Sequence, residues 1–255
     1  MSDRSGYVYV ASLSKAYYKA AVDSAVSLRA HYPEANITLF THEVFLKESD
    51  RKIFSNVVTG IPVHPRAKMW GMARSPYRNT LYIDSDTEIR SVNIKNVFDI
   101  LENNDIMFTK IIPHVAVSRT IDSENELEYH GGVILYNDRK LTTQLIEDWY
   151  DLYAEQKECR WNKSKFSMYN PRMQPWDQFT VWYLLNKVEK YQGIKHDFFP
   201  AGGHSYNYIH LLDDNILENK EYRKLEQIIY HYTIPRNIVN EGYMFFKSGS
   251  TADFN

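Results

Sequence analysis

Two aspartates stand close together at the end of an apolar segment. The stretch LYIDSDTEI places Asp84 and Asp86 directly after the apolar run Thr80–Ile83. Residues two apart project to the same side of an extended chain, so both carboxylates can approach one hard cation and a diphosphate that it carries. The same spacing is also typical of aspartates that only cap a turn or a helix. The pair therefore indicates a metal site only if other residues of the chain support it.

The run before Asp84 belongs to an alternation of predicted strands and helices. Short apolar runs predict strands at Tyr7–Ser12, Asn36–Thr41, Thr80–Ile83, Ile106–Thr109, Gly132–Asn137 and Ile228–Tyr232. Helices are expected at Lys68–Arg74, Ile94–Leu101, Leu141–Gln156 and Asp177–Lys190. This order predicts an α/β fold with a mostly parallel central sheet flanked by helices. Ligands of such sheets bind beyond the carboxyl ends of the strands, which is where Asp84 and Asp86 would lie.

A further helix is expected between the first two strands. Ser14 is a suitable N-cap, and an apolar stripe follows it at spacings of four, four and three residues, formed by Tyr17, Ala21, Ala25 and Leu28. Much later in the chain, Lys157–Pro175 is polar and aromatic without a clear period. We expect that segment to form a long loop over the site.

The bulk composition excludes several classes of protein. The chain has 255 residues and a formal net charge of −2, so we expect one domain that does not bind nucleic acid. Cys159 is the only cysteine, and it cannot form a disulfide within the chain. No apolar run is long enough for a signal peptide or a membrane span. These features favour a soluble protein of the reducing cytoplasm.

Five segments carry a resemblance to a known family, and they occur in order along nearly the whole chain. They are ASLSKAYYKAAV, KMWGMARSPYRNTLYIDSDTEI, HGGVILYN, PWDQFTVWYLLN and IIYHYTIP. Together they resemble the GT-A glycosyltransferases of the glycogenin and bacterial lipopolysaccharide galactosyltransferase group. The resemblance implies a single Rossmann-like GT-A domain over residues 1–255, with nucleotide binding in about residues 1–90. It also implies retaining transfer of a hexose from a nucleotide sugar, such as UDP-glucose or UDP-galactose, to a glycan, glycolipid or protein acceptor.

The resemblance extends to a metal site. In that family a strand-end Asp-x-Asp pair binds manganese together with a late histidine, which implies Asp84, Asp86 and His231 as ligands here. Two carboxylates and one imidazole suit Mn²⁺, or Mg²⁺, better than Ca²⁺, which prefers oxygen ligands alone. A histidine taken by itself would more often be a hydrogen-bonded structural residue.

Residues near the nucleotide follow from the same comparison. Ala11 and Ser12 would line the base pocket at the end of the first strand, and Ser85 lies between the two aspartates. Tyr17 aligns with a tyrosine that stacks on the base, although it could instead be a core residue of the helix stripe. Lys68 matches a family lysine close to the donor, where a cation helps to hold a diphosphate.

The segment before the predicted strand Gly132–Asn137 would approach the donor sugar. Glycines such as Gly131 and Gly132 permit a close approach of the backbone to a ligand, although a plain turn would also explain them. Relatives carry an asparagine where this chain has His130. This departure leaves the identity of the transferred sugar open.

The start of the helix expected at Asp177 would contribute the catalytic residues. The family has an Asp-Gln pair beside the reactive carbon of the sugar, which implies Asp177 and Gln178 here. A carboxylate at this place is otherwise an ordinary feature of a helix N-terminus. The family's late Lys-Pro-Trp element is absent, and the nearest substitute on the diphosphate is Arg236.

Two other functions are consistent with parts of the pattern. A sugar-phosphate nucleotidyltransferase also combines a strand-end carboxylate, a metal and a nucleotide, but it depends on a glycine-rich loop after the first strand. The corresponding segment here, ASLSKAYYK, contains no glycine. A non-catalytic protein that binds carbohydrate or nucleotide on the same fold is the stronger alternative.

Overall fold

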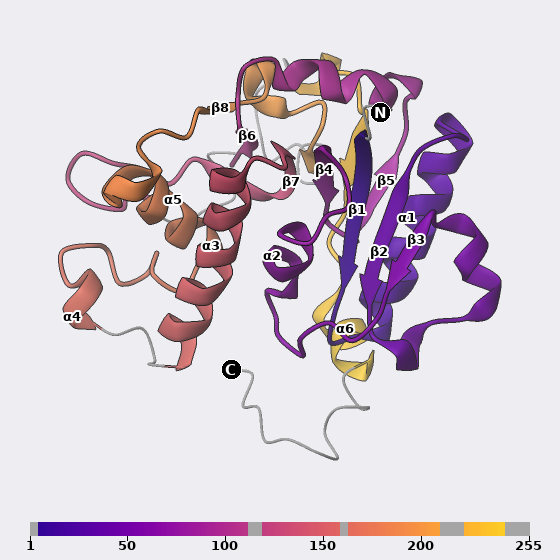
Figure 1. Cartoon of the computed structure of the whole chain (residues 1–255), viewed down its shortest axis with the longest axis horizontal. Helices are drawn as coiled ribbons and strands as arrows, with labels where there is room; N and C mark the ends of the chain where they lie inside the picture. Colours follow the sequence, from indigo (N-terminus) through magenta and orange to yellow (C-terminus); the bar gives the residue numbers. More distant parts are fainter. Residues whose placement is uncertain (1–4, 112–118, 159–162, 210–221, 243–255) are drawn as a thin grey trace.

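A central sheet organises the chain. The computed structural model describes residues 5–111, 119–158, 163–209 and 222–242. Within these ranges the sheet contains β1 (Ser5–Ala11), β2 (Ile37–Thr41), β3 (Asn56–Val58), β4 (Asn79–Ile83), β6 (Ile106–Lys110), β7 (Tyr129–Asn137) and β8 (His196–Phe198). Their order is β3-β2-β1-β4-β7-β6-β8. Neighbouring strands are parallel, except that β7 is antiparallel to both β4 and β6. The predicted α/β class with a mostly parallel sheet is confirmed (Figure 1).

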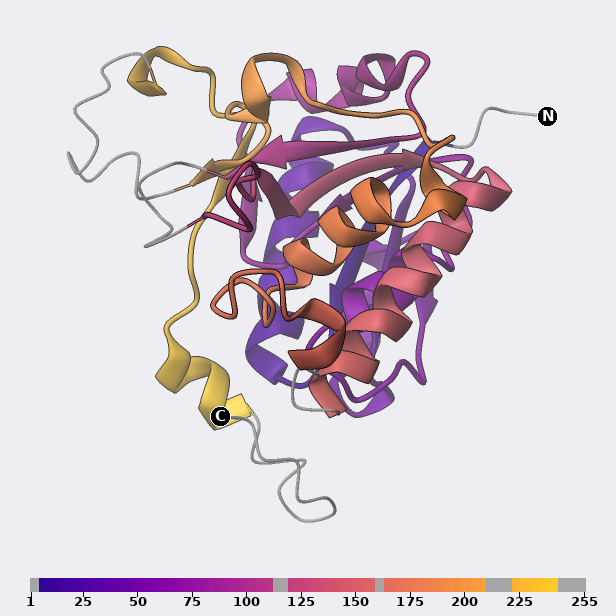
Figure 2. The same ribbon diagram turned by 90° about the vertical axis from the view of Figure 1, so that its left-hand side faces the viewer.

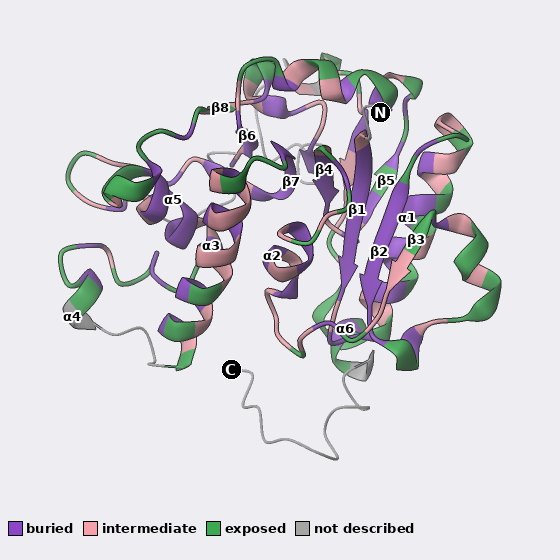
Figure 3. Ribbon diagram, viewed as in Figure 1, coloured by how far each residue is buried: buried purple, intermediate pink, exposed green. Residues whose placement is uncertain are grey.

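Alternation of side chains along the strands gives the sheet two buried faces (Figure 3). In β1, Val8 and Val10 belong to the core under α2 (Ala67–Met72), α3 (Lys140–Glu158) and α5 (Asp177–Lys187). Tyr7 and Tyr9 belong to the opposite core, under α1 (Lys15–His31). Helices α3 and α5 lie side by side on the first face (Figure 2). In the described part of the chain, no helix is both long and apolar enough to cross a membrane.

The helix α1 begins as the sequence predicts. The side chain of Ser14 accepts a hydrogen bond from the Ala16 amide at 3.2 Å and caps the helix. Of the predicted stripe, Ala21, Ala25 and Leu28 are fully buried. Tyr17 is only half-buried, whereas its neighbour Tyr18 is buried in the core. The ring of Tyr17 is therefore partly exposed and does not belong to the buried part of the stripe.

A second, smaller sheet stands beside the first and contains β5 (Thr87–Ile89), β9 (Tyr208–Ile209) and β10 (Ile229–His231). Strand β10 pairs antiparallel with β5, so that His231 is opposite Thr87. The amide of Tyr232 extends this pairing by donating to the Asp86 carbonyl at 3.0 Å. Because β5 directly follows the two aspartates, this pairing brings the late histidine next to them.

Several elements differ from the sequence predictions. The helix expected at Ile94–Leu101 is present, as the 3₁₀ helix η3 (Val92–Leu101). Its buried side chains include Ile94 and Val97, and residues three apart share one side of a 3₁₀ helix. Helix α5 ends at Lys187 and is followed by the separate turn Glu189–Tyr191. The short strands β3, β5, β8 and β9 were not predicted.

The segment Lys157–Pro175 is a loop only in part, because residues 167–175 form turns whereas the described residues before them are helical. It begins in the last turn of α3 and contains α4 (Lys163–Phe166), while residues 159–162, with Cys159, lie outside the described residues. The side chains of Phe166, Tyr169 and Met173 are buried in the core under α3 and α5. These aromatic and apolar anchors hold its described part against the domain.

Candidate active site

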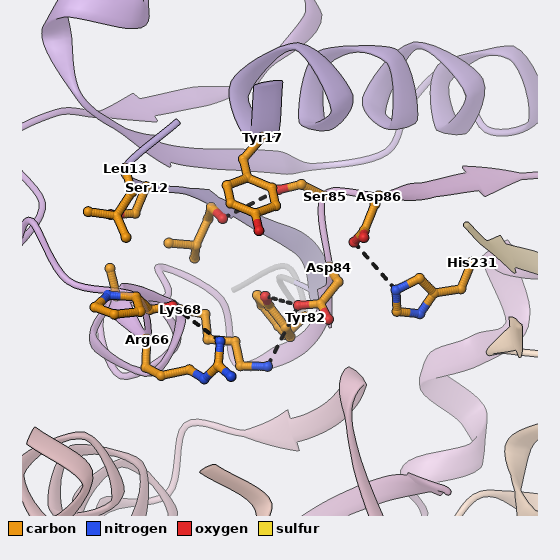
Figure 4. A pocket seen from close by; sticks show the side chains of 13 residues that line it. Ser12, Leu13, Tyr17, Arg66, Lys68, Tyr82, Asp84, Ser85, Asp86 and His231 are labelled. Atoms are coloured by element: carbon orange, nitrogen blue, oxygen red, sulfur yellow. Dashed lines mark hydrogen bonds and ion pairs between the residues drawn. The ribbon is translucent and has the colours of Figure 1, made fainter. Parts of the chain in front are cut away.

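A cavity of about 240 Å³ opens beyond the carboxyl ends of β1 and β4. The predicted residues that line it are Ser12, Tyr17, Lys68, Asp84, Ser85, Asp86 and His231 (Figure 4). They come from four separate stretches of the chain, and ligands of open α/β sheets bind at this edge. The cavity is therefore the candidate active site.

Three of these residues could hold a divalent metal ion. One ligand atom from each of Asp84, Asp86 and His231 can be chosen so that all three lie within 4.8 Å of one another. The Nε2 atom of His231 is 3.4 Å from Oδ1 of Asp86. Side-chain exposures of 25% for Asp84, 19% for Asp86 and 12% for His231 leave the group accessible from the cavity. Two carboxylates and one imidazole form a donor set that suits Mn²⁺ or Mg²⁺.

Asp84 is held in place by its neighbours. The hydroxyl of Tyr82 donates a hydrogen bond to Oδ1 of Asp84, and the Lys68 ammonium is 3.7 Å from the same atom. Burial alone would raise the pKa of Asp84, but the charges of Lys68 and His231 and the hydrogen bond from Tyr82 lower it overall. Asp84 is therefore ionised at neutral pH, as a metal ligand must be.

The pKa of His231 moves in the opposite direction. Burial would lower it, but the hydrogen bond and the charge of Asp86 raise it overall. The imidazole therefore lies in a strongly negative environment, which attracts a proton as it would attract a metal cation.

Asp177 lies on the other side of Lys68. Its Oδ2 atom is 3.2 Å from Lys68 Nζ and 3.4 Å from Arg66 Nε, and its side chain is only 3% exposed. Burial opposes ionisation, but Arg66 and then Lys68 outweigh it and lower the pKa of Asp177 to about 2. The indole of Trp149 donates to the Asp177 carbonyl at 2.7 Å and fixes the start of α5. This carboxylate, which lies between two cations, is therefore ionised at neutral pH.

The two predicted glycines permit close packing at this point. A Cβ atom on Gly131 would lie 3.0 Å from Lys68 Nζ and 3.8 Å from Cγ of Gln178. The Gly131 carbonyl accepts a hydrogen bond from Lys68 at 2.8 Å. A Cβ atom on Gly132 would lie 2.8 Å from ring atoms of both His130 and His231. A side chain at Gly132 would collide with both imidazole rings, whereas a side chain at Gly131 would need only a small shift of the flexible end of Lys68.

His130, the departure from the resembled family, packs against the metal group. Its ring is edge-on to that of His231, with centroids 5.7 Å apart. Its Nδ1 accepts a hydrogen bond from the Gly132 amide at 3.0 Å. Burial, and then the charge of His231, lowers the pKa of His130 to about 3, so this ring is neutral at physiological pH.

The end of β1 forms the remaining wall of the cavity. The hydroxyl of Ser12 is 3.3 Å from the carbonyls of Pro62 and His64. Leu13 has a φ of +66°, a strained backbone conformation that occurs often at functional sites. Ala11 is buried in the core under α1 and is not among the residues that line the cavity.

Arg236 differs from the prediction. It is exposed at the start of α6 (Arg236–Gly242) and does not belong to the cavity lining. Helix α6 packs near the start of α1, where the Ser14 hydroxyl donates to the Val239 carbonyl at 2.9 Å. This contact accounts for the position of Arg236 outside the cavity.

Sequence reasoning missed three residues of the site, Arg66, Tyr82 and Asn207. Arg66 stands at the N-cap of α2, two residues before Lys68, and no sequence pattern indicated its role. Tyr82 stands two residues before Asp84, where alternation along the strand would have placed these two side chains on one face. Asn207 lies in the polar segment HSYNYIH, between two short strands that sequence patterns did not distinguish.

Comparisons with known proteins agree on the fold. No protein-family model matches the chain, and no curated protein matches its sequence. Among solved structures, the glycosyltransferase GlyE of Streptococcus pneumoniae TIGR4 has a TM-score of 0.60 and 16% identity over 97% of this chain. This chain spans 64% of GlyE, less than two thirds of its length.

Two further structures match over nearly their whole length. The galactosyltransferase LgtC, in complex with donor and acceptor sugar analogues, has a TM-score of 0.55 and 15% identity over 97% of this chain and 98% of its own. Mouse xyloside xylosyltransferase 1 has a TM-score of 0.53 and 12% identity over 90% of this chain and 99% of its own. The resemblance inferred from the sequence is therefore confirmed at the level of the fold: this chain has the GT-A fold found in these glycosyltransferases.

Proposed function

We propose that the protein is a metal-dependent, retaining glycosyltransferase that moves a hexose from UDP-glucose or UDP-galactose to an acceptor. The observation that carries this proposal is the convergence of Asp84, Asp86, His231 and Lys68 on one cavity, with Asp177 buried directly behind Lys68. Such a group provides ligands for a metal, a cation for a phosphate and a charged carboxylate for the sugar. A binding module without catalysis would have no need of the last of these.

The charges around the cavity fit a diphosphate together with a divalent cation. Three carboxylates, those of Asp84, Asp86 and Asp177, and two cations, Arg66 and Lys68, lie at the cavity or directly behind it. With a neutral imidazole, the group carries one excess negative charge and would repel a diphosphate. A divalent cation reverses that sign, and when bound it neutralises the charge that develops on the departing diphosphate. Nucleotide binding should therefore require the metal.

The nucleoside would occupy the wall formed by the end of β1. The half-buried ring of Tyr17 lines the cavity there and is suited to stacking on a base. The hydroxyl of Ser12 and the backbone around Leu13 lie beside it. The overall charge of the chain is close to zero, so recognition of the phosphates depends on these local groups.

The sugar would lie toward Gly131, Asp177 and Gln178. The fixed negative charge of Asp177 is suited to stabilising an oxocarbenium-like transition state. Retention follows from the family resemblance, either by attack on the same face or through a transient covalent sugar on Asp177. Lys68 holds Asp177 and the Gly131 carbonyl together and so fixes the geometry of this part of the site.

Thermal unfolding provides the first test of the donor site. Ligands that bind only the folded state raise its apparent stability by RT ln(1 + [L]/Kd). We expect a manganese-dependent shift with UDP or a UDP-sugar, and none with GDP or CMP. The shift should be lost in Asp86→Ala and kept in Asp151→Ala, which removes an exposed carboxylate on α3. No shift with any nucleotide would contradict the proposal.

Slow hydrolysis of the donor tests catalysis without knowledge of the acceptor. We expect release of UDP from UDP-glucose or UDP-galactose in the presence of Mn²⁺, and its loss in Asp177→Asn. A manganese-dependent nucleotide complex that never releases UDP, with any acceptor tried, would favour the non-catalytic binding protein instead.

A further inference from the structure

Asn207 lies between the two histidines of the site. It precedes β9 and is only 2% exposed. One end of its amide is 2.8 Å from Nδ1 of His130 and 3.0 Å from the Thr109 hydroxyl. The other end is 2.8 Å from Nδ1 of His231. A single buried amide therefore contacts both rings.

The backbone of Gly132 determines which way this amide points. Its N–H donates to Nδ1 of His130 at 3.0 Å, and a backbone N–H can only donate. Nδ1 of His130 must then carry a lone pair, so the atom of Asn207 next to it must be the amide nitrogen. It follows that the amide oxygen of Asn207 faces His231. An oxygen can only accept, so Nδ1 of His231 must carry a proton.

The position of this proton affects the candidate metal ligands Asp84, Asp86 and His231. When Nδ1 of a neutral imidazole carries the proton, the lone pair is on Nε2. Nε2 of His231 is the atom that lies 3.4 Å from Oδ1 of Asp86. The His130 ring takes the opposite tautomer, with its proton on Nε2. By donating to His130, the Gly132 amide therefore determines the tautomer of His231 through the side chains of His130 and Asn207.

We propose that Asn207 is a positioning residue for the metal site: it fixes the tautomer and the orientation of His231, so that the lone pair of Nε2 points to the ion. The part of this inference that involves the ion rests on the proposed function. Partners of the second ring nitrogen commonly fix metal-binding histidines, and their loss typically costs about 10-fold to 100-fold in metal affinity.

The tautomers can be observed directly. Long-range ¹H–¹⁵N NMR correlations of the metal-free protein, recorded above the pKa values of both rings, should show the proton on Nδ1 of His231 and on Nε2 of His130. A proton on Nε2 of His231 would overturn the proposal. This measurement needs neither a variant nor a substrate, so it stands even if every Asn207 variant fails to fold.

Two variants of similar size separate hydrogen bonding from packing. Asn207→Asp keeps an acceptor for Nδ1 of His231 but loses the donor to His130, so its Kd for Mn²⁺ should rise by less than that of Asn207→Leu. Asn207→Leu removes the acceptor, so its Kd should rise by about 10-fold to 100-fold. A residue needed only for packing would give the opposite order, because a carboxylate is costlier to bury than a leucine. That opposite order would overturn the proposal.

Failure of the proposed metal site would give a different titration result from failure of the proposed role of Asn207. His231→Ala and Asp86→Ala serve as controls for the metal site in the same titration. If the parent does not bind Mn²⁺, or if both controls bind it as the parent does, the metal site itself is wrong. The NMR spectra would still decide the orientation of Asn207.

Discussion

Neutralising Asp177 should destabilise the fold far more than removing an exposed ion pair. Its pKa of about 2, against an ordinary 3.8, corresponds to about 2 kcal/mol in favour of the charged form. Asp177→Asn also leaves Lys68 and Arg66 facing each other, and breaking a buried pair typically costs about 3 to 5 kcal/mol. Because the Arg66 side chain is 38% exposed, solvent screens part of that cost. We therefore expect a loss of roughly 2 to 4 kcal/mol.

Urea unfolding at neutral pH, with a chelator present, measures this loss in the absence of metal. The control is Glu48→Gln, which removes a pair with Arg51 that is shorter, at 2.8 Å, but 88% exposed at Glu48. Its cost should be below about 0.5 kcal/mol. A cost for Asp177→Asn no larger than that of Glu48→Gln would refute the reasoning that burial sets the strength of the pair.

Two further measurements sharpen the test. A depressed pKa stabilises the folded state above the unfolded pKa, so the difference between the parent and Asp177→Asn should shrink as the pH falls from 3.8 toward about 2. Lys68→Met combined with Asp177→Asn should cost less than the sum of the two single changes, with a coupling of roughly 1 to 2 kcal/mol. Strict additivity would show that the two side chains do not interact.

Three other changes test separate parts of the site. Tyr17→Ala should weaken UDP binding by about 1 to 3 kcal/mol while Tyr17→Phe keeps most of it, since stacking needs only the ring; calorimetric titration measures both. Gly132→Ala places a Cβ 2.8 Å from the ring of His231 and should weaken Mn²⁺ binding, whereas Gly193→Ala, with nothing within 4 Å, should not. Burial and neighbouring cations lower the pKa of His64 from 6.5 to about 4, so below pH 6.5 the unfolded chain binds a proton that the folded one lacks. The free energy of unfolding should therefore decrease as the pH is lowered from 6.5 to about 4, and it should decrease less steeply in His64→Phe. Equal pH dependence of the two proteins in urea unfolding would contradict this assignment.

The two carboxylates of the candidate metal group could be predicted because their position follows from local rules. Asp84 and Asp86 end an apolar strand, and strand ends of an open α/β sheet define the binding edge. His231 needed the family resemblance, because nothing in its own surroundings places it near residue 86. The structure supplies the reason in the pairing of β10 with β5, a contact between segments far apart in the sequence.

The errors arose where tertiary contacts override local patterns. The stripe alone suggested Tyr17 as a core residue, whereas the structure places it, half-buried, in the cavity lining and buries Tyr18 instead. Period alone could not distinguish an α-helix from the 3₁₀ turns at Val92–Leu101. Arg66 reads as an ordinary surface charge before a helix, and only its distance from Asp177 shows its role.

The contacts of His130 show that a group absent from a sequence motif can be present in the structure on another segment of the chain. The resembled family carries an asparagine at the position of His130, so a motif comparison suggests that an amide has been lost from the site. The structure has an amide within hydrogen-bonding distance of that ring, on Asn207, which is 77 residues away in the chain. With Nδ1 of His130 accepting from both the Gly132 amide and Asn207, the imidazole behaves as a neutral, oriented group. Replacing His130 by asparagine would consequently alter the partner of Asn207 as well as the surroundings of His231, because the two side chains form one hydrogen-bonded unit with His231.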